Sequence, residues 1–174
     1  ITLGATIHVL DTIGMNNILE EDKNLIQYTM NKLTNYKEIH VYGDTDIKNC
    51  PRAGTISFNI QNMDHGLIAT ILNDYFNIAV RNECFCAHPY VQEMLGTTHK
   101  KELDNCEFIN NNLSWKMESW MGMVRISFGI YNNVKDVDIL ISSIDKIIKN
   151  KNFYKKQYNI DNHGDYKHIN FKFS

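Results

Sequence analysis

The chain lacks the features that mark membrane proteins and nucleic-acid-binding proteins. No apolar run in its 174 residues approaches the roughly 18–20 residues that span a bilayer, so we expect no transmembrane helix. Its 18 Lys and Arg residues are balanced by 20 Asp and Glu residues, which gives a formal net charge of −2. A nucleic-acid surface usually carries a basic excess, so we expect neither a membrane nor a nucleic acid as partner.

Cysteine is scarce, and the first residues do not resemble a secretion signal. The chain has 4 cysteines, which do not make a disulfide scaffold in a chain of this length. We therefore expect reduced thiols and a cytoplasmic protein. The first residues, Ile1 to Leu10, have neither a basic flank nor an initiator methionine, so we do not expect them to form a signal peptide. We expect them to be the middle of a helix from a longer chain.

The pattern of apolar residues predicts helices that alternate with short strands. A hydrophobic content of 43% supports one domain, or one domain with extensions. Residues 96–122, which include a Trp115/Trp120 pair, are expected to form a long connection. The alternation favours an α+β fold, a small sheet covered by helices. Periodicity predicts helices at 3–13, 17–36, 64–75, 89–95 and 134–149, and strands at 39–42, 55–60, 78–81 and 124–130.

The most informative segment is residues 79–90, AVRNECFCAHPY. It indicates the end of a strand, a polar loop, a cysteine and the start of a helix. Pro89 suits the first helical turn, and a cysteine ahead of such a turn feels the positive end of the helix dipole, which favours thiolate. Arg81 adds positive charge or holds an anionic substrate. We therefore predict that Cys86 is reactive, and that Cys84 is either a resolving thiol or a chance neighbour.

Three segments together resemble one enzyme family. Residues 79–90 resemble the active-site cysteine loop of the cysteine desulfurase and selenocysteine lyase group, within the class V aminotransferases that depend on pyridoxal phosphate. Residues 52–59 resemble the strand that opens the family's small C-terminal domain, and residues 124–132 resemble its late strand. The segments follow the family's order, and the resemblance runs from about Ile1 to Lys149.

The resemblance implies a fold and a division of the chain. The expected fold is a small, mostly antiparallel sheet covered by helices, as in the small C-terminal domain of fold type I pyridoxal-phosphate enzymes. Residues 1–36 would be a helical segment linking from a missing large domain, and residues 37–149 the small domain. Residues 150–174 would be a C-terminal tail that is weakly ordered or packs on another part of the parent.

The resemblance also implies roles for three residues. Cys86 stands where the family's thiol takes sulfur from the substrate and becomes a persulfide. Arg125 stands where an arginine grips the substrate carboxylate, a task that suits the guanidinium fork. Arg81 either binds substrate or orients the loop. Glu83 departs from the family, which commonly has glycine there; if the position needs a positive φ, glutamate strains the loop, and its carboxylate tends to raise the pKa of a neighbouring thiol.

No credible Schiff-base lysine is found in the sequence. Residues 98–100, Thr-His-Lys, superficially match the family's lysine motif, but they follow the cysteine loop and lack the glycines that should come after Lys100. Pyridoxal phosphate is therefore expected in the parent enzyme, not in this chain, which alone should be inactive. The resemblance implies an amino-acid substrate, a homodimeric parent and a sulfur-acceptor protein.

Other interpretations remain open. The spacing of Cys84, Cys86 and His88 is tighter than that of usual zinc sites, so we expect no metal. His65 is expected to be structural or solvated. The alternative functions are a stand-alone, cofactor-free module that binds a small carboxylate or carries sulfur, and a class V enzyme with a substrate other than a sulfur amino acid.

Overall fold

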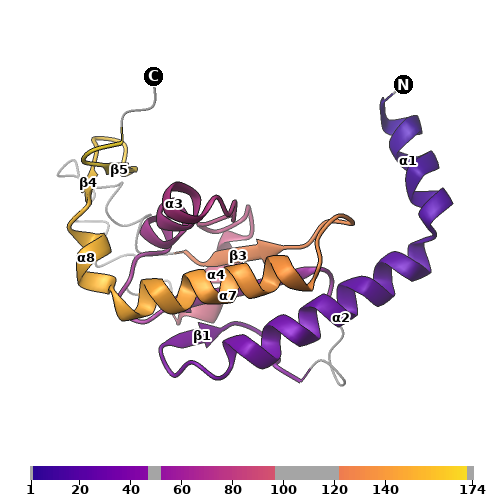
Figure 1. Ribbon diagram of the computed structural model, residues 1–174, viewed down its shortest axis with the longest axis horizontal. Helices are drawn as coiled ribbons and strands as arrows, with labels where there is room; N and C mark the ends of the chain where they lie inside the picture. The colour runs from indigo at the N-terminus through magenta and orange to yellow at the C-terminus, as the bar shows by residue number, and fades with distance from the viewer. Residues whose placement is uncertain (1, 47–51, 97–121, 172–174) are drawn as a thin grey trace.

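Two helices form the N-terminal part of the molecule. The computed structural model describes residues 2–46, 52–96 and 122–171. Helix α1 (Thr2–Ile13) ends at Gly14, whose φ of 89° breaks the helix before α2 (Met15–Leu33) begins. Figure 1 shows α1 projecting away from the rest of the molecule, and none of its residues is buried. The C-terminal half of α2 is different, because it carries the buried side chains Leu25, Ile26, Met30 and Leu33.

A three-stranded antiparallel sheet forms the centre of the fold. Its order is β1 (Ile39–Val41), β2 (Thr55–Ile60) and β3 (Val124–Ser127). Side chains alternate along β2, so that Ile56, Phe58 and Ile60 face the core. The mixed architecture with a small antiparallel sheet and helices agrees with the predicted α+β class.

Two predicted strands are shorter than expected. The strand at 78–81 reduces to a single bridge, in which Arg81 pairs with Arg125. The preceding residues leave helix α3 through a left-handed Asn77. After the bridge, the Glu83 carbonyl still accepts from the Met123 N–H at 3.1 Å, but Glu83 itself turns the backbone to a φ of 79°, out of the strand conformation. The strand predicted at 124–130 ends at Ser127, because β2, its partner, begins at Thr55 opposite that residue.

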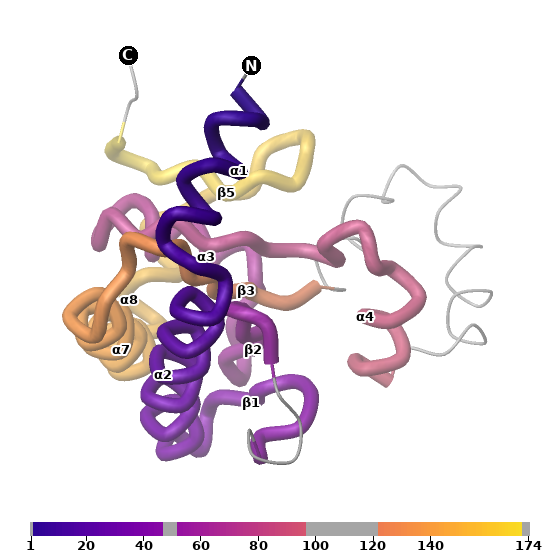
Figure 2. The backbone as a smooth tube through the Cα atoms, turned by 90° about the vertical axis from the view of Figure 1, so that its right-hand side faces the viewer, coloured from indigo at the N-terminus to yellow at the C-terminus, as the bar shows by residue number. Residues whose placement is uncertain are grey.

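Helices α3 (His65–Phe76) and α7 (Val134–Lys149) complete the main core. The Asp64 carboxylate caps α3 by accepting from the backbone N–H groups of Gly66 at 2.8 Å and Leu67 at 3.3 Å. A capping box of Asn133 and Asp136 starts α7. In Figure 2, α2 and α7 lie on one side of the sheet and α4 (His88–Leu95) lies on the other. The buried side chains of α7 are Val137, Leu140, Ile141, Ser143, Ile144 and Ile147.

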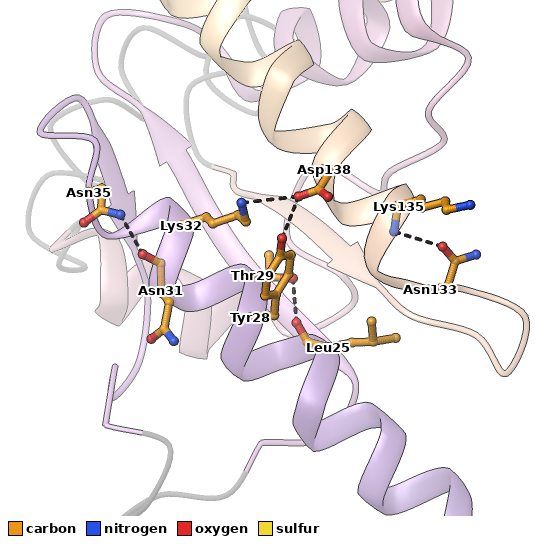
Figure 3. A network of polar contacts seen from close by, with 9 residues as sticks. All are labelled: Leu25, Tyr28, Thr29, Asn31, Lys32, Asn35, Asn133, Lys135 and Asp138. Carbon is orange, nitrogen blue, oxygen red and sulfur yellow. Dashed lines mark hydrogen bonds and ion pairs between the residues drawn. The ribbon is translucent and has the colours of Figure 1, made fainter.

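A polar contact joins α2 to α7 at the surface. The Tyr28 hydroxyl donates to the Asp138 carboxylate at 2.8 Å, and the Lys32 ammonium lies 3.3 Å from the same oxygen (Figure 3). The hydrogen bond from Tyr28 holds the pKa of Asp138 below its usual value. The two helices are thus connected by a directional contact in addition to their apolar packing.

Over the residues described, the C-terminal segment forms regular elements that pack on α3, which agrees with the expectation of packing on another part of the protein rather than with that of weak order. Helix α8 (Lys151–Lys155) leads into a hairpin of β4 (Tyr158–Ile160) and β5 (Tyr166–His168). The hairpin packs on α3 through polar aromatic contacts. The Tyr158 hydroxyl donates to Asp74 at 3.0 Å, and His168 Nε2 lies 2.8 Å from the Tyr75 hydroxyl. Tyr158 is also buried, so its aromatic ring adds apolar area to the core.

Some predictions fall outside the described residues. These are Lys100 and the Trp115/Trp120 pair, which belong to the expected connection at 96–122. Within the described ranges, no helix has both the length and the apolar character needed to cross a bilayer.

Candidate functional site

The cysteine loop lies between the Arg81 bridge and helix α4. Cys86 is exposed and directly precedes Ala87, the N-cap of α4, and Pro89 lies in the first turn as predicted. Within the loop the Ala87 N–H donates to the Cys84 carbonyl at 2.8 Å. The loop therefore presents the Cys86 thiol to solvent at the start of a helix.

The backbone of this loop adopts unusual torsion angles. Glu83 has a φ of 79°, Phe85 a φ of 54° and Cys86 a φ of 62°. Positive φ is uncommon for residues other than glycine and costs of the order of 1–3 kcal/mol where it is held by the surroundings. The positive φ suspected at Glu83 is present, so glutamate occupies a position that favours glycine.

Glycine at position 83 should give a more stable protein than alanine at the same position. Because glycine adopts positive φ without a Cβ clash, we expect Glu83→Gly to raise the free energy of unfolding by about 1 kcal/mol relative to Glu83→Ala. Both variants remove the carboxylate, so their difference isolates the backbone effect. Urea unfolding followed by circular dichroism measures it. Equal stability of the Gly and Ala variants would contradict the assignment of strain to this residue.

The structure brings the two predicted substrate-binding arginines together. The Arg81 N–H donates to the Arg125 carbonyl at 3.1 Å, and the Arg125 N–H donates to the Arg81 carbonyl at 2.6 Å. Residues paired in this way in an antiparallel ladder project their side chains from the same face. Ser57 of β2 lies opposite Arg125 on its other side. Like charges directly opposite each other are unfavourable, so this face is suited to an anion that lies between them.

The Arg125 guanidinium also contacts the cysteine loop. It lies over the ring of Phe85, 5.0 Å from the ring centroid, and its Nε donates to the Ser127 hydroxyl at 3.2 Å. Phe85 directly precedes Cys86 in the chain, so Cys86, Arg81 and Arg125 belong to one region of the molecule. The roles predicted for these three residues remain predictions, but their proximity is a structural finding.

The two cysteines of the loop differ in environment. Cys86 is exposed, whereas Cys84 is 8% exposed and packs in a small apolar cluster with Tyr42, Val91 and Met123. A buried cysteine of this kind usually acts as a small apolar side chain. The difference agrees with Cys86, rather than Cys84, as the candidate nucleophile.

A polar cavity of about 590 Å³ lies beside the loop. It is bounded by the start of α3, by Glu83 and Cys84 of the loop, by α4 and by the turn of the C-terminal hairpin. Burial, together with the Asp64 carboxylate, raises the pKa of Tyr166, the first residue of β5, to about 12. The sequence prediction missed the hairpin as a wall of this cavity; the aromatic residues of the tail were the available signal.

The residues of the cavity do not fit pyridoxal phosphate. Its lining contains the carboxylates of Asp64, Glu83 and Asp165 and several imidazoles, but no lysine and no arginine. A phosphate ester would face these carboxylates without a compensating cation, and no lysine is available for a Schiff base. This cavity therefore provides no cradle for this cofactor.

The histidines and cysteines of the region do not form a metal site. Across residues 2–46, 52–96 and 122–171, no group of His, Cys, Asp or Glu side chains is arranged to hold a metal ion. His65 is 5% exposed, its Nδ1 lies 3.4 Å from the Asn82 amide nitrogen, and a Cβ at Gly122 would lie within 2.4 Å of its ring. This close packing is typical of a structural histidine.

Comparison with known proteins gives consistent matches. The family model for aminotransferase class-V matches residues 1–140. A probable cysteine desulfurase of Borreliella burgdorferi is 31% identical over 150 residues, covering 86% of this chain and 29% of that protein. A probable cysteine desulfurase of Halalkalibacterium halodurans is 29% identical over 149 residues, covering 84% of this chain and 29% of that protein.

Solved structures show the same likeness. The apo structure of a cysteine desulfurase from Thermococcus onnurineus NA1 has a TM-score of 0.65 and 27% sequence identity, covering 84% of this chain and 30% of that one. The chain thus spans less than a third of the length of the relatives that it matches. The matched family region ends at residue 140, before α8 and the C-terminal hairpin.

Proposed function

Because the chain belongs to the aminotransferase class-V family, we propose that it is the C-terminal part of a pyridoxal-phosphate-dependent enzyme that acts on a sulfur or selenium amino acid. The names of the similar proteins, cysteine desulfurases, support this substrate class. The cofactor and its lysine would lie in the remainder of the enzyme, in keeping with the share of its relatives that this chain spans. By itself the chain would be inactive.

The observation that carries the proposal is an exposed cysteine at a helix start, directly after the Phe85 ring that contacts Arg125, whose backbone pairs with Arg81. In the proposed reaction Arg125 holds the carboxylate of the substrate cysteine through a bidentate contact, and Arg81 adds positive charge. The C–S bond of the substrate breaks, and an S–S bond forms on Cys86. The substrate carbon takes up a proton, so that alanine and a Cys86 persulfide are the products.

The proposal also gives each segment a place in the larger enzyme. Residues 1–36 would connect the large domain to the small domain. The large domain would cover the exposed apolar side chains of α1, such as Leu3 and Ile7. Residues 37–149 would be the small domain of a fold type I enzyme, and residues 150–174 a C-terminal extension. The parent would be a cytoplasmic homodimer that passes its sulfur to an acceptor protein.

Persulfide formation tests the proposal. The enzyme with its large domain is incubated with cysteine, digested without reductant and examined by mass spectrometry. We expect one additional sulfur atom on the peptide that contains Cys86 and none when serine replaces the cysteine substrate. Turnover of cysteine without sulfur on Cys86 would reject its role as acceptor.

A second candidate function follows from Glu83. Because glutamate, at a φ of 79°, stands where the family commonly has glycine, the parent would be a class V enzyme with a different amino-acid substrate. Consumption of another amino acid, together with no reaction of cysteine, would favour this alternative. Binding of a small carboxylate or a stable persulfide by the chain alone would favour a stand-alone, cofactor-free module.

The chain alone should not bind pyridoxal phosphate in a Schiff base. The lining of the cavity offers no lysine, and Lys100 lacks the context of a cofactor lysine. Mixing the 174-residue chain with pyridoxal phosphate should therefore give no stable, stoichiometric Schiff-base absorbance band at the boundary between ultraviolet and visible wavelengths. A specific band that disappears in Lys100→Ala would overturn this prediction.

A further inference from the structure

The contacts of Arg125 leave one side of its guanidinium available. One face lies over the Phe85 ring at 5.0 Å, and Nε donates to the Ser127 hydroxyl at 3.2 Å. Within the described residues no acceptor is recorded for the two terminal nitrogens, Nη1 and Nη2. The group is thus held by the ring and through Nε, and its other edge, which carries the fork of N–H donors, meets no acceptor among the described residues and suits a carboxylate.

An aromatic support has a specific advantage here. A carboxylate placed beside Arg125 would fix the guanidinium too, but it would neutralise the charge and occupy the in-plane donors. An aromatic ring attracts the cation through its face and accepts none of the in-plane N–H groups. Phe85 therefore restricts the orientation of the guanidinium while leaving its charge and its donors for a ligand.

The loop holds Phe85 in place despite a conformational cost. A φ of 54° is rare for a bulky aromatic residue and persists only where surrounding contacts outweigh the strain. The half-buried ring also packs against the apolar cluster that includes Tyr42, Val91 and Met123. Phe85 thus contacts both this cluster and the arginine, and Cys86 follows it directly.

We propose that Phe85 is a positioning residue: its ring orients the Arg125 guanidinium for a carboxylate and fixes that carboxylate relative to the Cys86 thiol. The proposal deepens the proposed function and rests on it for the identity of the carboxylate, the amino-acid substrate. The contact itself, and its effect on anions near Cys86, do not depend on desulfurase activity.

The test compares two alkylating reagents at Cys86. Iodoacetate and iodoacetamide present the same reacting carbon to the thiol, but only iodoacetate carries a carboxylate. The ratio of their rates at Cys86, measured by peptide mass spectrometry at low ionic strength, reports recruitment of a carboxylate independently of general thiol reactivity. The variants are Phe85→Leu, which keeps apolar volume without an aromatic face, and Phe85→Tyr, which keeps the face.

We expect Phe85→Leu to lower this ratio by about threefold to fivefold, the size of an exposed cation–π contact, and Phe85→Tyr to leave it unchanged. In an Arg125→Gln background, Phe85→Leu should have no further effect. If Phe85→Leu does not fold, Phe85→Met provides a second apolar variant. An unchanged ratio in a folded apolar variant, or an equal loss with and without Arg125, would overturn the proposal.

The complete enzyme provides a second readout. With cysteine as substrate, Phe85→Leu should raise KM about fivefold with little change in kcat, and Phe85→Tyr should restore the wild-type KM. A fall in kcat alone would contradict a role in carboxylate orientation. If the wild-type enzyme does not react with cysteine while the alkylation ratio behaves as expected, the proposed function fails and the role of Phe85 stands.

Discussion

Replacing Cys86 by serine is expected to lower sulfur transfer by the complete enzyme about a thousandfold or more, because a serine hydroxyl cannot accept sulfur to form a persulfide. Cofactor loading and folding should be little changed, since the Cys86 side chain is exposed and contributes little to the core. The measurement is alanine formation from cysteine in the presence of a reductant that regenerates the thiol.

Cys84→Ala is the matched control for this experiment. Cys84 lies in the same loop but is packed among apolar side chains, so alanine should preserve most of the activity while lowering stability modestly. Equal losses of activity in Cys84→Ala and Cys86→Ser, with both variants folded, would contradict the assignment of the nucleophile to Cys86.

Arg125→Ala should weaken substrate capture strongly. Loss of a desolvated, charge-assisted and bidentate contact costs about 2–5 kcal/mol, which should appear in kcat/KM for an amino-acid substrate. Arg125→Lys should recover only part of the loss, because an ammonium cannot reproduce the fork that Phe85 and Ser127 hold in place.

Arg81→Ala provides the comparison for Arg125. Arg81 pairs with Arg125 through the backbone, and this pairing survives truncation of the side chain. Since Arg81 is also more exposed, its removal should have the smaller effect on kcat/KM. Near-equal values for the parent, Arg125→Lys and Arg125→Ala would mean that Arg125 is only a charge on the strand surface.

The elements that the sequence predicts best are those determined by local signals. The alternation along residues 55–60 and the Asp64 cap gave the starts of β2 and α3 directly. The period of apolar residues likewise gave α7 as Val134–Lys149. Capping and periodicity depend on side chains a few positions apart, so both can be predicted from the sequence without knowledge of the tertiary fold.

The features that the sequence could not predict depend on distant partners. The packing of the C-terminal hairpin depends on contacts of Tyr158 and His168 with α3, which lies far away in sequence. The antiparallel register that sets Arg81 opposite Arg125 is likewise a tertiary property, and so is the contact of Arg125 with Phe85. The sequence resemblance identified both arginines and Cys86 but gave no geometry that relates them.

The docking of the C-terminal hairpin on α3 determines how the protein should be shortened or tagged. A boundary chosen from the matched family region, which ends at residue 140, would cut through α7 and remove every partner of Tyr75 in the hairpin. A boundary at residue 149 would keep α7 but leave the aromatic surface of α3 open to water and to association between molecules. Expression versions should therefore extend through residue 171, and an affinity tag at that end needs a spacer, since the hairpin turn borders the cavity beside the cysteine loop.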